Sequence, residues 1–250
     1  MKSNDTLLLL LFIPAWLLTV NSCTHKVQPQ PVTFETIKTN QNGTGQALTL
    51  EFTGGSAHNH PLMVVWIETE NGEYIQTLFV AESIGKGVFK YGTPASGKWM
   101  PGSILRPAAL PYWGHKRGIK TAEGLFLPSA ENPVPDAYTG PTPTSHFILE
   151  TRADNPLPQR FRVLLEINQS WDWNEYWTNN KYPDNKEYKT SSQPSLIYAA
   201  EVNLDQPTRE VTFTPIGHGH YAGEDGKLYT DLTTITTALN ITSSIKLKIK

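Results

Sequence analysis

The chain of 250 residues contains a single cysteine, no long run of basic residues and no convincing amphipathic helix. One cysteine cannot form a disulfide within the chain, so the folded part must be held together by a hydrophobic core. A net charge of −2 without a basic cluster argues against nucleic acid as a partner. The missing helical periodicity argues against a helical fold class.

Familiar catalytic motifs are also absent. The sequence has no Gly-x-Ser-x-Gly turn, no P-loop, no dinucleotide-binding fingerprint and no His-Glu-x-x-His pair. Its carboxylates are scattered, and no two of them stand out as a general acid and base. These absences favour a redox carrier or a binding protein over an enzyme that uses one of the common catalytic arrangements.

The N-terminus resembles a bacterial lipoprotein signal. Lys2 precedes an apolar run at residues 7–18, which is too short for a comfortable membrane span but is typical of a signal-peptide core. The run leads to Val20-Asn21-Ser22-Cys23, where Cys23 would become the lipidated first residue of the mature protein. We therefore expect a signal peptide at residues 1–22 and a lipidated tether at residues 23–31. The protein would be held by membrane lipid in the bacterial cell envelope, in the periplasm or at the cell surface.

The rest of the chain, residues 32–250, is predicted to form a single all-β domain. Short segments alternate apolar and polar residues or are strongly apolar, as half-buried or buried strands are. Asn71-Gly72, between two such segments, is the strongest short-range signal for a hairpin. The expected fold is a β-sandwich with immunoglobulin-like topology. We expect strands at residues 32–39, 47–53, 63–69, 74–81, 146–152, 161–168, 195–204, 210–215 and 245–249, and one short helix at residues 232–239.

A long Gly- and Pro-rich insertion at residues 85–135 interrupts the strand pattern. It is far longer than an ordinary connection between strands, and such insertions tend to carry function or to be mobile. Trp99, Tyr112 and Trp113 lie within it, and a second aromatic cluster occupies residues 171–177. These aromatic loops are predicted either to stack on a planar ring or a sugar, or to form a small satellite core over the ends of the sandwich.

Two His-x-His pairs are candidate metal ligands: His58 with His60, and His218 with His220. In an extended strand, residues i and i+2 point to the same side, so each pair would present two imidazoles together. If the fold brings the pairs together, their four nitrogens would suit Cu(II), Ni(II) or Zn(II). One pair alone could bind a metal or a flavin phosphate, and histidines that border loops are otherwise ordinary solvated side chains.

The segment Asp136-Ala137-Tyr138-Thr139-Gly140-Pro141-Thr142 resembles the acceptor motif of covalently flavinylated bacterial proteins. In those proteins a secreted flavin transferase attaches FMN to the last Thr through a phosphodiester. The resemblance implies Thr142 as the acceptor hydroxyl, with a cofactor site completed by Asp136, Thr139 and Gly140. Pro141 stands where the motif usually has Ala. Taken without the resemblance, a Gly-Pro step between extended segments is typical of a surface turn.

A second resemblance covers most of the chain. Residues 61–78 (PLMVVWIETENGEYIQTL) are similar to the opening hairpin of predicted periplasmic proteins of the domain-of-unknown-function 2271 family. That family also carries an Asp-x-x-Thr/Ser-Gly-Ala-Thr segment, which residues 136–142 match apart from Pro141. The similarity implies a membrane-anchored FMN electron carrier, with a flavin transferase and a membrane redox protein as partners.

A binding lipoprotein without redox chemistry is the alternative hypothesis. It would use the His-x-His pairs for a metal ion, or the aromatic loops for a glycan or a protein partner. The two hypotheses predict different colours for the isolated protein. A flavoprotein is yellow as isolated, whereas a metal-binding protein is not coloured unless it holds a metal such as copper.

Overall fold

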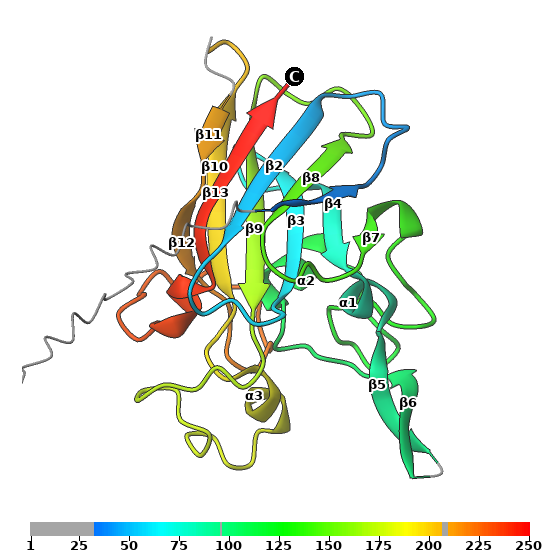
Figure 1. Cartoon of the computed structure of the whole chain (residues 1–250), viewed down its shortest axis with the longest axis vertical. Coiled ribbons are helices and arrows are strands. Elements are labelled where there is room, and N and C mark those ends of the chain that lie inside the picture. Colours follow the sequence, from blue (N-terminus) through cyan, green and yellow to red (C-terminus); the bar gives the residue numbers. More distant parts are fainter. Residues whose placement is uncertain (1–32, 96, 207–209) are drawn as a thin grey trace, which may run out of the picture. The chain divides into compact units, whose positions relative to one another are not determined.

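The computed structural model describes residues 33–95, 97–206 and 210–250. The predicted signal peptide, Cys23 and the tether lie outside these residues. Residues 33–250 form one compact unit, and two facing sheets give it the predicted all-β sandwich architecture (Figure 1). The immunoglobulin-like topology stays a prediction. Within the described ranges, no helix combines the length and the apolar character that crossing a bilayer requires.

The first sheet consists of β1 (Glu35–Lys38), β2 (Ala47–Gly54), β8 (Phe147–Arg152), β11 (Glu210–Thr212) and β13 (Thr242–Ile249). Their order in the sheet is β1-β8-β2-β13-β11, and β1 runs parallel to β8 while the other neighbours are antiparallel. Along β2, Leu48, Leu50 and Phe52 are buried and the residues between them are partly exposed. This is the pattern that the alternating sequence predicts.

The second sheet consists of β3 (Leu62–Thr69), β4 (Tyr74–Ala81), β7 (Thr139–Gly140), β9 (Arg160–Asn168), β10 (Leu196–Asn203) and β12 (Thr214–His218). Their order is β12-β10-β9-β3-β4-β7, and only β7 runs parallel to its neighbour. β3 and β4 form the predicted hairpin. Gly72 has a φ of 85° in its turn, a conformation that glycine adopts without steric strain.

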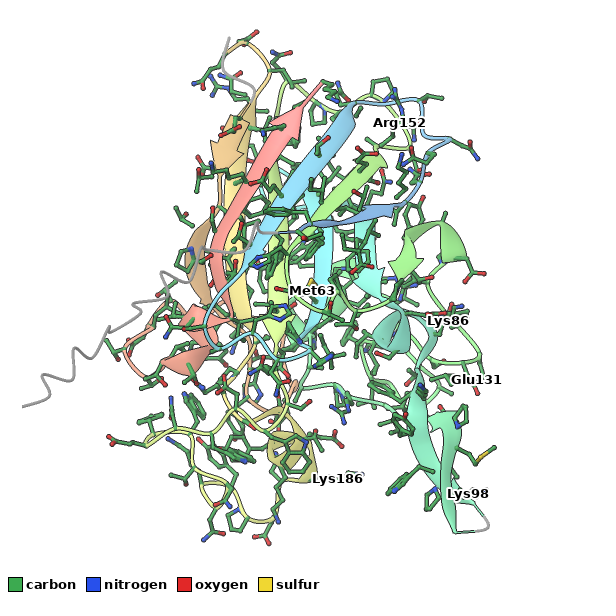
Figure 2. The ribbon with its side chains drawn as sticks, in the orientation of Figure 1. Met63, Lys86, Lys98, Glu131, Arg152 and Lys186 are labelled. Atoms are coloured by element: carbon green, nitrogen blue, oxygen red, sulfur yellow. The ribbon has the colours of Figure 1, made fainter. Side chains whose placement is uncertain are left out.

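β3 is buried on both faces, which explains its continuous apolar sequence. Met63 and Val65 face the first sheet and belong to the core between the sheets, where Figure 2 labels Met63. Val64 and Trp66 point the other way, because successive side chains of a strand alternate, and belong to a second apolar cluster. Both clusters are built from residues 33–250, so this part of the chain encloses its own hydrophobic cores.

The insertion covers the outer face of the second sheet. α1 (Glu82–Lys86) leads into it, and it contains a hairpin of β5 (Val88–Ala95) and β6 (Lys98–Ser103), and α2 (Pro111–Arg117). Tyr112 and Trp113 of α2 are buried in the second apolar cluster together with Trp66. The β5–β6 hairpin is a separate two-stranded sheet that extends away from the two larger sheets (Figure 1).

Two local predictions are wrong. The single strand expected at residues 210–215 is divided: β11 pairs with β13 in the first sheet, and β12 pairs with β10 in the second. Phe213, between them, is buried, and its backbone N–H donates to the Ile245 carbonyl at 3.0 Å, so the chain changes sheets there. The helix expected at residues 232–239 is replaced by turns and a 3-10 helix, η2 (Thr237–Asn240), because threonine has low helix propensity.

Candidate functional site: the cleft beside Thr142

The predicted acceptor segment runs along the edge of the second sheet. Asp136 opens a 3-10 turn, η1 (Asp136–Tyr138), and the following Thr139–Gly140 form β7, which pairs with the end of β4. The hydroxyl of Tyr138 donates to both carboxylate oxygens of Asp154, at 2.9 and 2.8 Å. The segment is therefore tied down through β7 and leaves the sheet at Pro141.

Gly140 is required by packing. A Cβ at this position would lie 2.9 Å from Cε2 of Phe79 and 3.6 Å from Cγ2 of Ile37. Phe79 is fully buried between the sheets, so a larger residue at position 140 would disturb the core. The glycine of the motif thus lets β7 lie close to the sandwich and sets where the next two residues, Pro141 and Thr142, reach the surface.

Thr142 lines a surface cleft of about 760 Å³. α1 contributes to one side of the cleft, and the base of the β5–β6 hairpin contributes the aromatic side chains of Phe89 and Tyr91. His60 and Arg106 also line it. The volume lies within the range of small-molecule sites in proteins. The structure therefore places the predicted acceptor residue beside a cleft that can hold a cofactor.

The cleft is rich in positive charge. Lys86, Lys90 and Arg106 line it, and Glu82 is the one carboxylate-bearing side chain among its described lining residues. The ammonium of Lys86 lies 2.8 Å from Glu82 and 3.2 Å from Asp136, and these hydrogen bonds raise the pKa of Lys86. Asp136 of the motif is thereby connected to the cleft. An anionic group would be favoured in this environment.

Arg106 is the most buried of these cations. Its guanidinium lies over the ring of Phe89, 4.9 Å from the centroid, and donates to the hydroxyl of Ser170 at 2.7 Å. Burial lowers the pKa of Arg106, and its Nε is buried without a hydrogen-bond partner among the described residues. A positive charge in a partly buried position is unfavourable, so an anion near this guanidinium would stabilise it.

The first His-x-His pair is not on an extended strand. His60 has a φ of 50°, so the same-side relation that an extended strand gives does not apply to His58 and His60. His60 is exposed and lines the Thr142 cleft, where its Nδ1 lies 3.2 Å from Oδ1 of Asn59. His58 packs edge-on against Phe52, and burial lowers its pKa.

The second pair lies elsewhere on the second sheet. His218 ends β12, where its Nδ1 lies 2.8 Å from the Gly219 carbonyl oxygen and its ring stacks on Tyr229. Burial lowers the pKa of His218. Nδ1 of His220 accepts from the backbone N–H of Ala222 at 3.2 Å.

The structure does not bring the two pairs together. His218 pairs with Leu196, Leu196 with Ile167, and Ile167 with Met63 near the start of β3. Three strand spacings, roughly 14 Å, therefore separate His218 from this end of β3. Among residues 33–95, 97–206 and 210–250, no three His, Cys, Asp or Glu side chains are grouped as metal ligands.

Sequence patterns did not reveal two buried carboxylates that hold the insertion in place. Glu68 is fully buried, and it accepts hydrogen bonds from Nε1 of Trp66 at 2.9 Å and from the guanidinium of Arg162 at 2.7 Å. The ammonium of Lys116, from α2, lies 3.8 Å away. The Trp-x-Glu pattern of β3 therefore has a structural role, and the signal for it was a carboxylate inside an apolar strand.

Glu166 is the second buried carboxylate. It accepts hydrogen bonds from the Ser195 hydroxyl at 2.5 Å and from the backbone N–H groups of Trp113 at 2.8 Å and Tyr112 at 3.2 Å. It thus binds the first turn of α2, which has no side-chain cap of its own. Burial outweighs these hydrogen bonds and raises the pKa of Glu166 to about 7.

Some aromatic side chains of the two aromatic loops are buried and others are exposed. Tyr112 and Trp113 belong to the second apolar cluster, and Trp177 packs against Tyr188 in the core between the sheets. These three side chains are therefore packed in apolar clusters, but Trp177 lies in the main core, and Tyr112 and Trp113 pack on the outer face of the second sheet. The strongly exposed aromatic side chains of the insertion and of residues 171–177 are Tyr91, Trp99, Trp171 and Tyr176.

Comparisons of the chain with protein families, with curated proteins and with solved structures find no match. The resemblance of residues 61–78 and 136–142 to flavinylated periplasmic proteins stays a prediction.

Proposed function

We propose that this protein carries FMN bound covalently to Thr142 and relays electrons outside the cytoplasm. The position of Thr142 carries the proposal: the residue lines a cleft that also has cationic and aromatic side chains. Fixing the flavin covalently suits a carrier outside the cytoplasm, because a free cofactor would diffuse away. When bound, the flavin ring supplies the electron-transfer chemistry.

The residues of the cleft fit the two parts of this cofactor. Lys90 and Arg106, which line the cleft, would hold the negative charge of a phosphodiester. Phe89 and Tyr91 would provide apolar surface for a planar ring. Lys86, paired with Asp136, would keep the acidic residue of the motif beside the attachment point.

Attachment requires a transferase and a flavin dinucleotide donor. Oγ of Thr142 would attack the phosphorus on the flavin side of the pyrophosphate. The Oγ–P bond would form, the bond between that phosphorus and the bridging oxygen would break, and adenosine monophosphate would leave with the electron pair. The hydroxyl proton would pass to a base of the transferase. The Asp136 side chain is 85% exposed, so a partner enzyme can reach the segment.

The proposal extends to location and partners. Lipidation at Cys23 would hold the protein on a membrane of the bacterial cell envelope, and a membrane redox protein would supply the electrons. The sandwich then serves as a rigid support for the cofactor.

Co-production with a flavin transferase in a bacterial periplasm tests the attachment. We expect the wild type to give a fluorescent band on a denaturing gel under ultraviolet light, and Thr142→Ala to give none. Thr144→Ala is the matched control, because Thr144 is an exposed threonine two residues along the same loop and should keep the band. A dark wild-type band beside a fluorescent known acceptor would contradict the proposal.

Glycan binding without redox chemistry is a second candidate, favoured by the loop at residues 171–177. Trp171 is 66% exposed and has a φ of 66°, a conformation that is unfavourable for a bulky residue. Tyr176 lines a separate cleft of about 360 Å³ together with Thr233, Thr234 and Thr236. An exposed aromatic ring beside hydroxyl groups suits a sugar face. Loss of binding to a glycan array in Trp171→Ala, with a colourless native protein, would favour this candidate.

A further inference from the structure

The β5–β6 hairpin exposes an unusual amount of apolar surface. The described residues include seven strongly exposed large hydrophobic side chains, and four of them lie in this hairpin: Val88, Tyr91, Trp99 and Met100. Trp99 is 63% exposed and Tyr91 is 64% exposed. Exposed apolar side chains that gather on one element usually mark an interaction surface.

The same hairpin is basic. Residues 88–103 contain Lys90 and Lys98 and no Asp or Glu, although the whole chain carries a net charge of −2. Lys98 lies at the far end of the hairpin (Figure 2). The surface therefore combines apolar side chains with uncompensated positive charge.

The pairing of the two strands places apolar side chains on both faces of the hairpin. Trp99 pairs with Pro94, and Met100 pairs with Thr93. Successive side chains of a strand point to opposite faces, so Trp99 and Met100 lie on opposite sides of this ribbon. A protein partner that covered one face would leave the other in water, whereas a lipid layer surrounds an inserted element on all sides.

We propose that the β5–β6 hairpin inserts its end into the surface of an anionic lipid bilayer. Trp and Tyr prefer the boundary between headgroups and acyl chains, and lysines are attracted by anionic headgroups. The base of the hairpin lines the Thr142 cleft, so insertion would hold that cleft near the membrane surface. The proposal does not depend on flavin at Thr142.

Vesicle flotation of residues 33–250, which enclose their own cores, tests the proposal. We expect this protein to float with vesicles that contain phosphatidylglycerol and to remain behind with pure phosphatidylcholine. Trp99→Ser with Met100→Ser should lower the partition coefficient by roughly tenfold or more. The double variant Lys90→Glu/Lys98→Glu should also have a lower partition coefficient, and added salt should weaken vesicle binding by the wild type. Trp171→Ser changes a similarly exposed tryptophan of another loop and should leave the partition coefficient unchanged.

Three results would overturn the proposal. The first is no flotation of the wild type with anionic vesicles. The second is equal flotation of the wild type and the Trp99/Met100 double variant. The third is a wild-type dimer in light scattering that the double variant loses, without vesicle binding, because a second copy of the chain would then cover the hairpin. All four substituted side chains of the hairpin are solvent-exposed, so circular dichroism should show unchanged folding in the variants.

Discussion

Replacing Glu166 by glutamine tests how the insertion is held on the second sheet. The carboxylate of Glu166 is fully buried and binds the first turn of α2, the helix that places Tyr112 and Trp113 in the second apolar cluster. Glutamine has nearly the same shape and cannot ionise. The substitution therefore separates the effect of the charge from the effect of packing.

The expected magnitude follows from the pKa. Burial raises the pKa of Glu166 from 4.5 to about 7, a shift that corresponds to about 3 kcal/mol. The folded state binds the proton of Glu166 more tightly than the unfolded state does. The stabilisation that this proton gives to the folded state is fully present below the pKa of Glu166 in the unfolded chain, and it is lost as the pH rises through the pKa in the folded chain. The wild type should thus lose about 3 kcal/mol of folding free energy relative to the variant, most of it between about pH 5 and pH 8.

The assay is urea denaturation of wild type and Glu166→Gln at several pH values. The amide of glutamine cannot accept all the hydrogen bonds that the carboxylate accepts, and this loss does not depend on pH. The informative quantity is therefore the change with pH of the stability difference between the two proteins. His58 and His218 titrate in both proteins and cancel in this difference. Glu201→Gln, at an exposed position of β10, is the control for a glutamate-to-glutamine substitution outside the buried site.

A stability difference that stays constant from about pH 5 to pH 8 would refute the reasoning. It would mean that the hydrogen bonds from Ser195 and from the α2 backbone keep Glu166 ionised, and that burial does not dominate its pKa. A difference that moves in the opposite direction would refute it more strongly.

Two further predictions concern the insertion and the acceptor segment. Arg162→Met should destabilise the fold by about 3 kcal/mol, because Glu68 is left buried without its closest cation, whereas Lys116→Met should cost about 1 kcal/mol. Chemical denaturation measures both, and equal effects would show that Arg162 is not the main partner. Pro141→Ala should raise the rate of flavin transfer to Thr142, because alanine restores a backbone N–H and a free φ beside the acceptor. A slower transfer in a single-turnover assay would show that proline favours the reactive conformation.

The sequence predicts most of the sandwich because the signals for its strands are local. The alternation of Leu48, Leu50 and Phe52 and the turn at Gly72 each depend on a few neighbouring residues. The change of sheets at Phe213 cannot be predicted in this way. Both β11 and β12 are strands, and only their distant partners show that they belong to different sheets.

The candidate site also combines features with a local sequence signal and features that depend on distant parts of the chain. The proposed acceptor segment comes from a resemblance of residues 136–142, whereas the cleft beside it could not be predicted from the sequence. The side chains of Phe89 and Arg106 line the same cleft as Thr142 only through the folding of the insertion. At the first His-x-His pair, the left-handed backbone at His60 removes the same-side relation that an extended strand would give, and the sequence did not indicate this backbone conformation.

The central claim is that Thr142 carries the flavin, and intact-mass spectrometry of denatured protein tests it most directly. After co-production with an active flavin transferase, we predict that the wild type and Thr144→Ala gain the mass of one FMN less one water. Thr142→Ala should gain none, and fragmentation should place the added mass on Thr142. An unmodified wild type beside a modified known acceptor, or an added mass that persists in Thr142→Ala, would contradict the account.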